Sequence, residues 1–433
     1  MAKKTVGLYT LGCKVSQYET EAIAEEFLRQ GFAVAPFDTV CDVYVINTCT
    51  VTAESDRKSR QMIRRAQKTN PQAPILVTGC YAQTSPDEVA AIAGVAYVCG
   101  NDGKMKLPAR AKALLDGAQP SVEVVPLEGL PFEPMKIERA PRTRAYVKIE
   151  DGCECRCTYC AIPAARGPVR SKPPQAVLSE VKDLVASGVA EIVLTGIETA
   201  SYGSDFVNFD LLDLLELLDR ESGAARIRLG SMTPEWFRPE RIARLCRLPS
   251  VTPHFHLSIQ SGADAVLRNM RRRYNRTQAL SAIHGLREAF PTLELTADFI
   301  VGFPMESDED FADTLAFASE AEFLSMHVFA YSKRKGTPAA EMKGQVEESV
   351  KRQRSERLIS LGKTLTEERL KKVLARNATL SVLMETKENG LFHGHTESFL
   401  EVSAPTDKDL GGKLVTVRPT HFADGRLYGE IVN

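Results

Sequence analysis

Short apolar segments alternate with longer amphipathic segments over the first hundred residues. Each apolar segment has six to eight residues, as a buried strand does, and the four of them are 5–12, 43–48, 74–79 and 95–100. Helical patterns follow at 18–31, 53–68 and 85–94. This alternation is typical of an α/β domain built on a mostly parallel sheet. Residues 101–141 contain six prolines, which predict a short helix followed by a linker.

A second series of strand-like and helix-like segments begins near Ala145. Its six apolar segments are 145–151, 191–197, 226–232, 254–260, 294–304 and 324–332, with helical patterns between them. Six such units predict a partial TIM-like (βα)6 barrel, or an open sheet curled in the same sense. Residues 347–376 are charged and have a helical pattern.

The pattern of apolar and polar positions changes again after Asn377. Four short alternating segments follow, at 379–386, 391–404, 413–422 and 426–433. The turn sequences Glu-Asn-Gly, Gly-Gly and Asp-Gly separate them, which predicts a small all-β barrel. The fold class is therefore α/β multidomain. We expect an N-terminal domain at 1–113, a linker at 114–140, a barrel domain at 141–370 and a C-terminal barrel at 371–433.

The composition is that of an ordinary globular protein, with 43% hydrophobic and 26% charged residues. No apolar stretch approaches the roughly 18 residues of a membrane helix, and the N-terminus lacks the pattern of a signal peptide. We therefore expect a cytoplasmic protein with no membrane partner, whose ten cysteines are reduced. The formal net charge of −1 means that any nucleic-acid partner must be met by local basic patches.

Four of the ten cysteines lie within eight positions, in the sequence DGCECRCTYCAIP. Cys153, Cys157 and Cys160 form a C-x3-C-x2-C motif that begins where the first strand of the middle domain ends, and barrels build their sites at such ends. Three thiolates on one loop can hold three irons of an iron–sulfur cube and leave the fourth iron open. A structural zinc would need a fourth closed ligand, which only Cys155 could supply within this loop.

Three further cysteines follow predicted strands of the N-terminal domain. Cys13, Cys49 and Cys80 stand at equivalent positions, and the ends of parallel strands converge at one sheet edge. They are therefore candidates for a second three-thiolate site, although a free cysteine often packs as a small core hydrophobe. Cys99 satisfies the same positional rule and is not excluded. For Cys41 and Cys246 we favour a structural role.

The C-x3-C-x2-C motif, with Tyr159 before its last cysteine, resembles the radical S-adenosylmethionine superfamily. Sequence segments from about residue 4 to the C-terminus resemble the methylthiotransferases. They are LGCKVSQYETE, INTCTVT, TGCYAQ, LTGI, SYG, LGSM, HLSIQSG and IVGFPMESDEDF. This resemblance implies an N-terminal methylthiotransferase domain, a radical core and a C-terminal TRAM barrel.

The resemblance also implies two 4Fe–4S clusters and S-adenosylmethionine. Cys153, Cys157 and Cys160 would hold the catalytic cluster, and Cys13, Cys49 and Cys80 would hold the auxiliary cluster. Cys99 and Cys155 would then have no ligand role.

Within this family, LGCKVSQYE is most similar to the branch that acts on N6-threonylcarbamoyladenosine in tRNA, although Ser16 stands where Asn is usual. That branch implies radical methylthiolation of the adenine C2–H bond at position 37, beside the anticodon. The expected partners are tRNA and an electron donor such as a flavodoxin or ferredoxin. The alternatives are a methylthiotransferase for isopentenyladenosine in tRNA or for a ribosomal protein, and, from another class, a zinc-bearing RNA-binding protein.

The ends of the barrel strands are expected to line the S-adenosylmethionine site. The candidates are Tyr159, Gly196, Ser231, Gln260, Asp298 and Gly302, each of which could equally be an ordinary turn or capping residue. Glu198 stands where relatives often carry His or Asn and is assigned no role. Basic stretches at 57–68, 268–276 and 333–335 are candidates for RNA phosphates. Phe392, Phe399, Phe422 and Tyr428 could stack on bases or pack as core.

Overall fold

The computed structural model describes residues 3–139 and 143–432, so predicted segments that reach 1–2, 140–142 or 433 end outside it. The N-terminal part is a six-stranded parallel sheet in the order β2-β1-β3-β4-β5-β6. Its strands are β1 Thr5–Thr10, β2 Ala33–Ala35, β3 Val43–Thr48, β4 Ile75–Gly79, β5 Val95–Cys99 and β6 Ser121–Glu123. Its helices are α1 Lys14–Arg29, α2 Ala53–Thr69, α3 Cys80–Thr84, α4 Pro86–Ala90, the 3-10 turn η1 Lys104–Lys106 and α5 Leu107–Leu115.

Local sequence explains how this sheet presents its carboxyl edge. Every residue of β3 is buried, as expected for a central parallel strand with helices on both faces. At the end of β4, Gly79 has a φ of +97°, and a Cβ there would lie 2.4 Å from the carbonyl oxygen of Thr48. Only glycine allows so close an approach, which sets Cys80 at the first position of α3.

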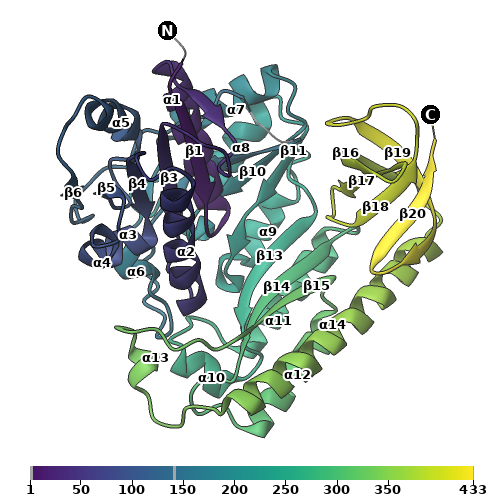
Figure 1. The fold of residues 1–433 in the computed structure, drawn as a ribbon. Helices are drawn as coiled ribbons and strands as arrows, with labels where there is room; N and C mark the ends of the chain where they lie inside the picture. The colour runs from purple at the N-terminus through teal and green to yellow at the C-terminus, as the bar shows by residue number, and fades with distance from the viewer. Residues whose placement is uncertain (1–2, 140–142, 433) are drawn as a thin grey trace.

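The middle part has the six predicted barrel strands in two parallel sheets, of order β11-β10-β7 and β12-β13-β14-β15, which together form a partial barrel (Figure 1). Its barrel strands are β7 Arg144–Lys148, β10 Glu191–Thr195, β11 Arg226–Leu229 continued as β12 Ser231–Met232, β13 His254–Gln260, β14 Glu294–Val301 and β15 Ser325–Ala330. A short antiparallel pair, β8 Glu150–Asp151 with β9 Arg170–Ser171, follows β7, with the cysteine loop and α6 between the two strands. The helices and 3-10 turns are α6 Ile162–Arg166, α7 Pro174–Ala186, η2 Thr199–Ser201, α8 Leu211–Glu221, η3 Pro234–Trp236, α9 Pro239–Leu245, α10 Asp264–Asn269, α11 Arg276–Ala289, α12 Asp308–Ala321 and α13 Pro338–Glu341.

The C-terminal part is a closed five-stranded barrel in the order β16-β17-β18-β20-β19, as predicted. The long helix α14 Glu348–Ala375 leads to it along the barrel domain (Figure 1). The strands are β16 Leu380–Glu388, β17 Leu391–Thr396, β18 Glu401–Pro405, β19 Leu414–Ala423 and β20 Arg426–Ile431. One predicted segment, 391–404, is in fact two strands, because the chain turns at 397–400, where Phe399 has a φ of +70°.

The short strands β2 and β6 were not predicted, because three residues are too few to show a period. β6 lies within 114–140, the stretch predicted as a linker, and pairs with β5. None of the helices in the described residues combines the length and the apolar character needed to cross a bilayer.

The three parts pack closely against one another. Helix α1 packs on β7, and α3 packs on α6, so the N-terminal sheet closes on the open side of the barrel. The C-terminal barrel sits at the amino ends of the barrel strands, where Arg226 donates to the carbonyl of Ser381 at 2.8 Å. There the ring of Phe399 stacks between His254 and His395, at centroid distances of 4.6 and 4.7 Å.

Candidate functional site

Three cysteines of the N-terminal domain gather at the carboxyl edge of its sheet. Cys13 precedes α1, Cys49 directly follows β3 and Cys80 opens α3, and β1, β3 and β4 are neighbours in the sheet. Burial raises the pKa of Cys49 to about 11, and the nearby thiols of Cys80 and Cys13 add to this effect. The structure therefore brings together the three thiols that the sequence grouped.

Cys99 is different, although it also lies at the end of a strand. It is the last residue of β5 and is buried in an apolar cluster with Val6, Leu76 and Leu107. Burial raises the pKa of its thiol to about 12. Its surroundings are those of a core residue.

The loop that carries Cys153, Cys157 and Cys160 follows the β8 strand of the barrel domain. Each of these sulfurs is approached by an N–H group. The Cys153 sulfur is 3.5 Å from the Cys155 amide, the Cys160 sulfur is 3.4 Å from the Ile162 amide, and the Cys157 sulfur is 3.3 Å from an Arg272 guanidinium nitrogen. Such donors stabilise thiolates and tune the clusters that they hold.

Cys155 lies beside the triad and interacts with one of its members. A hydrogen bond with the Cys153 thiol lowers the pKa of Cys155 to about 6, with Arg272 and Arg273 adding to the effect against its burial. The same hydrogen bond, together with burial, raises the pKa of Cys153. The fourth cysteine is therefore close enough to compete for metal during assembly.

Neither set of cysteines has the spacing of a zinc site. Sulfurs bound to one zinc at about 2.3 Å stand less than about 4 Å apart. Among residues 3–139 and 143–432, the only group of three ligating side chains whose donor atoms all lie within 4.8 Å is His256, Asp298 and His327. Wider spacing suits thiolates that each bind a different iron of a cube.

Five of the six residues predicted to contact S-adenosylmethionine lie at the carboxyl edge of the barrel. They are Tyr159 in the cysteine loop, Gly196 after β10, Ser231 at the start of β12, Gln260 at the end of β13 and Gly302 after β14. Gln260 has a φ of +65°, and a Cβ on Gly302 (φ +69°) would lie 2.3 Å from the Lys351 side chain. Asp298 lies three residues before the end of β14, inside the barrel.

Buried carboxylates beside the cysteine loop were not predicted. Glu150, Glu198 and Glu235 each keep one buried carboxylate oxygen without a hydrogen-bond partner among the described residues. Burial raises the pKa of Glu198 to about 8, and the nearby Cys155 thiol contributes. Unsatisfied acceptors at this edge fit a ligand with a positively charged group, as the amino and sulfonium groups of S-adenosylmethionine are.

Two family profiles match the chain. The Radical SAM superfamily matches residues 147–318, and the uncharacterized protein family UPF0004 matches residues 5–100. The threonylcarbamoyladenosine tRNA methylthiotransferase MtaB of Bacillus subtilis (strain 168) is 42% identical over 96% of this chain and 93% of its own length. The chain belongs to the radical S-adenosylmethionine methylthiotransferase family.

Other relatives and solved structures agree with this membership. MtaB of Thermotoga maritima is 38% identical over 92% of this chain and 91% of its own length. The tRNA-2-methylthio-N(6)-dimethylallyladenosine synthase of Natranaerobius thermophilus is 33% identical over 98% and 95%. The radical S-adenosylmethionine methyltransferase TsrM from Kitasatospora setae has the same fold, with a TM-score of 0.58 at 15% identity over 78% of this chain and 77% of that one.

In this methylthiotransferase, a buried polar contact joins the two cysteine regions. Arg166, at the end of α6, donates from Nε to the Cys80 sulfur at 3.1 Å. Asn101 donates to the same sulfur at 3.6 Å and to the carbonyl of Ala165 at 2.7 Å. Arg166 also binds Glu19 of α1, 147 positions away in the sequence, so no local pattern could have revealed the contact.

A hydrogen-bonded triad lies deeper in the barrel, on three adjacent strands. The Asp298 carboxylate is 3.0 Å from His256 Nε2 and 3.2 Å from His327 Nδ1. Burial alone would raise the pKa of Asp298, but these two hydrogen bonds hold it below its usual range.

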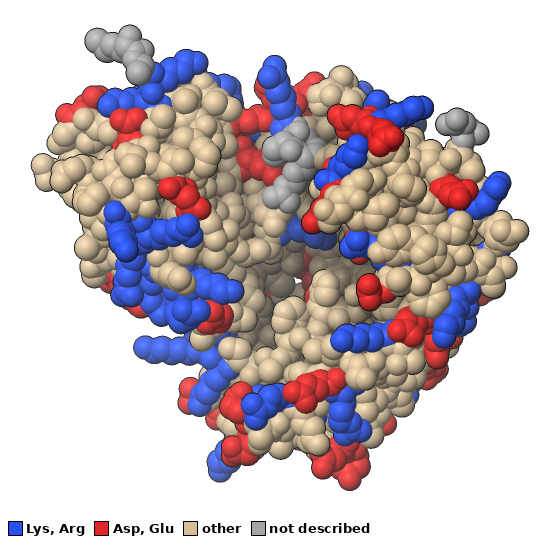
Figure 2. Space-filling view, turned by 45° about the vertical axis from the view of Figure 1, so that its right-hand side comes forward, with Lys and Arg blue, Asp and Glu red and all other residues tan. Residues whose placement is uncertain are grey.

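Figure 2 shows a hollow between the N-terminal domain and the rest of the molecule, with Lys and Arg side chains gathered along the N-terminal side.

The three basic stretches do not all form exposed patches. In the second, Arg272 turns inward to the Cys157 sulfur. In the third, Arg334 donates to Thr50 and Asp56 of the N-terminal domain at 2.7 and 2.8 Å. The first remains at the surface, where Arg60, Arg64 and Lys68 of α2 line a groove together with residues 88–93.

The aromatic candidates are also divided. Phe392 is buried in the core of the C-terminal barrel, and Phe422 is packed against that core. Phe399 is held in the interface with the barrel domain. Tyr428 stacks on His421 at 5.0 Å.

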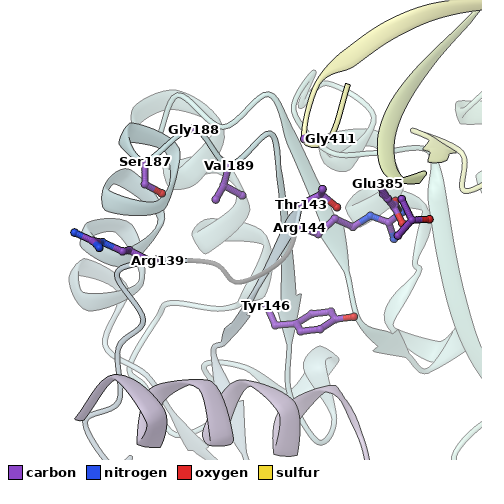
Figure 3. A pocket seen from close by; sticks show the side chains of 11 residues that line it. Arg139, Thr143, Arg144, Tyr146, Ser187, Gly188, Val189, Glu385 and Gly411 are labelled. Carbon is purple, nitrogen blue, oxygen red and sulfur yellow. Dashed lines mark hydrogen bonds and ion pairs between the residues drawn. The ribbon is translucent and has the colours of Figure 1, made fainter. Parts of the chain in front are cut away.

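A separate groove of about 830 Å³ lies at the amino end of β7, away from the cysteine loop. Arg139, Arg144 and Tyr146 line it together with the C-terminal barrel. In Figure 3, Arg144 extends from β7 toward Glu385, with which it forms an ion pair. The groove belongs to the contact between the two barrels rather than to the cysteine site.

Proposed function

We propose that this chain is a tRNA methylthiotransferase that converts N6-threonylcarbamoyladenosine at position 37 to its 2-methylthio derivative. The observation that carries the proposal is the presence of two separate three-cysteine sets joined through Arg166, in a chain that matches its relatives over nearly full length. The relatives named for threonylcarbamoyladenosine reach 42% identity, whereas those named for dimethylallyladenosine reach 34%.

We assign the cofactors to the residues that fit them. Cys153, Cys157 and Cys160 hold the catalytic 4Fe–4S cluster, and Cys13, Cys49 and Cys80 hold the auxiliary one. Tyr159, Gly196, Ser231, Gln260, Asp298 and Gly302 line the site of S-adenosylmethionine. When bound, these groups would supply the one-electron chemistry that removes the adenine C2 hydrogen and the methylthio group that takes its place.

The residues of the chain itself hold and orient these groups. No side-chain base can remove an adenine C2 proton at neutral pH, so the protein is not required to place a general base there. Arg272 donates to Cys157 and Arg166 donates to Cys80, one to each cysteine set. Glu198 and Glu235, each with a buried oxygen that has no hydrogen-bond partner among the described residues, are the candidates to hold a cationic ligand group.

The proposal includes the partners and the division of the chain. The partners are tRNA and an electron donor such as a flavodoxin or ferredoxin, and the location is cytoplasmic. The domains are 1–113, 141–370 and 371–433, with 114–140 as a linker from which β6 returns to the N-terminal sheet.

Nucleoside mass spectrometry of tRNA from a deletion strain tests the proposal. We expect loss of the 2-methylthio-threonylcarbamoyl nucleoside and its return with the wild-type gene. Loss of a methylthio isopentenyl nucleoside instead, or unchanged tRNA with an altered ribosomal protein, would assign another substrate.

Purified protein provides the second part of the test. Two cubes of four irons predict a brown protein with about eight irons per chain, whereas a colourless protein that contains zinc would support an RNA-binding role. Cys153→Ala should abolish cleavage of S-adenosylmethionine. Cys49→Ala should keep cleavage but lose methylthiolation, and full methylthiolation by this variant would exclude an auxiliary cluster at Cys49.

A further inference from the structure

Lys14 is an exposed cation that directly follows one of the auxiliary cysteines. It is the first residue of α1 and directly follows Cys13. Its side chain is accessible to solvent, and among the described residues its ammonium group has no hydrogen bond and no ion pair. The buried cations nearby are all engaged, since Lys104, Lys148 and Arg166 bind Glu19.

The charges around Lys14 favour an anion. Two arginines, Arg228 and Arg144, act on its ammonium group, and Asp298 is the only carboxylate among its principal electrostatic neighbours. Asp298 is not available as a partner, because both of its oxygens are taken by His256 and His327. Arg144 and Arg228 are themselves paired with Glu191, so among the described residues Lys14 is the cation of this group that has no carboxylate partner.

We propose that Lys14 binds the carboxylate of the threonylcarbamoyl group and selects for substrates that carry it. This inference rests on the proposed function. The adenine C2 atom has to reach the sulfur held at Cys13, Cys49 and Cys80, so the base has to come close to Lys14, which directly follows Cys13. The threonyl carboxylate is only a few bonds from the same ring, within reach of a flexible lysine side chain.

Two other anions could meet a lysine in this enzyme. The carboxylate of S-adenosylmethionine is one of them, and because it is present with either RNA, comparison of the acid with the ester separates it from the threonyl carboxylate. A phosphate of the tRNA backbone offers the same kind of oxygen ligand, and the experiment has to separate it from the threonyl carboxylate.

The test uses the holoenzyme and two anticodon stem-loop RNAs of identical sequence. One carries threonylcarbamoyladenosine, and the other carries its neutral methyl ester. Dissociation constants are measured by anaerobic fluorescence anisotropy, and kcat/KM by single-nucleoside mass spectrometry. Iron content and the electron paramagnetic resonance spectrum establish that both clusters remain in each variant.

We expect wild-type protein to bind the acid about ten- to hundredfold more tightly than the ester, as for a hydrogen bond to a charged group. Lys14→Gln should lose this factor on the acid and bind the ester as the wild type does, and Lys14→Arg should recover much of it. Lys363→Gln, which removes an equivalent charge from the exposed face of α14, should behave as the wild type.

Equal binding of acid and ester by the wild-type protein would overturn the inference, whatever the stability of the variants. Loss by Lys14→Gln of the same factor on both RNAs would assign Lys14 to a backbone phosphate. A wild-type enzyme that does not methylthiolate the acid at all would instead refute the proposed function.

Discussion

Removal of the Arg166 side chain should weaken the contact between the two cysteine regions and change the reduction potential of the auxiliary cluster. Arg166 is fully buried, and one face of its guanidinium contacts Glu19 while Nε donates to the Cys80 sulfur. Arg166→Met preserves the volume and removes the charge together with every hydrogen bond. The polar link left between α6 and α3 would then be Asn101, which donates to the carbonyl of Ala165 in α6 and to the Cys80 sulfur in α3.

The magnitude follows from what is left behind. Removing one partner from a buried ion pair costs about 3–5 kcal/mol, because the other charge stays buried. Here Glu19 keeps Lys148 at 2.7 Å and Lys104 at 3.2 Å, so we expect a loss near the lower end, about 3 kcal/mol. The double variant Arg166→Met with Glu19→Gln should be destabilised by less than the sum of the two single changes.

The assay combines unfolding with measurements on the clusters. Urea unfolding under anaerobic conditions gives the free energy, and iron analysis with redox titration reports each cluster. Loss of an N–H donor to a ligand sulfur should lower the potential of the auxiliary cluster and leave the catalytic cluster unchanged.

Arg170→Met provides a matched control, because Arg170 is a buried arginine that lies 3.5 Å from Asp151. Within residues 3–139 and 143–432 it contacts no cysteine sulfur, so its loss should destabilise the protein without changing either potential. If the two variants shift the potential of the auxiliary cluster equally, or neither shifts it, the Arg166–Cys80 contact does not tune that cluster.

Three further predictions concern single side chains. Cys155→Ser should leave iron content and methylthiolation unchanged, and a loss of about four irons would instead make Cys155 a ligand. Burial raises the pKa of Glu306 from 4.5 to about 7, although the nearby Arg354 acts in the opposite direction. Between these two pH values the folded protein binds more protons than the unfolded chain, so its free energy of unfolding should fall as the pH rises. Glu306→Gln should reduce this pH dependence in urea titrations from pH 4.5 to 7. Phe399→Ala should cost about 3 kcal/mol and speed proteolysis between α14 and β16, because the ring fills the interface between the barrels; unchanged cleavage would mean that Arg226 and Arg228 hold that interface alone.

The sequence was sufficient for the parts of the fold that depend on periodicity. Buried strands such as β3 and β14 have apolar runs of strand length, and both barrels follow from the number of such runs. The three-residue strand β6 has no such signal, and the turn at 397–400 interrupts a segment whose alternation continues through it. Equivalent strand-end positions were sufficient to group Cys13, Cys49 and Cys80, but only packing separates them from Cys99.

The interactions around the cysteines depend on contacts between distant segments. The sequence of a basic segment does not show which of its side chains point to solvent. Arg272 and Arg334 were therefore expected at the surface, but they face inward. The triad of His256, Asp298 and His327 comes from three separate strands, and its register is set by the barrel. The link between Arg166 and Cys80 requires the docking of two domains.

The charge balance at that docking surface gives an independent argument about the auxiliary site. Within the buried ion-pair network, four cations, Lys104, Lys148, Arg166 and Arg170, meet two carboxylates, Glu19 and Asp151. Two further carboxyl groups, Glu133 and Glu150, lie close enough to Lys104 and Lys148 to interact with them. The Cys80 sulfur is the group that Arg166 reaches beyond its carboxylates. The Arg166 guanidinium therefore stabilises negative charge on the Cys80 sulfur, and metal binding requires this sulfur as a thiolate.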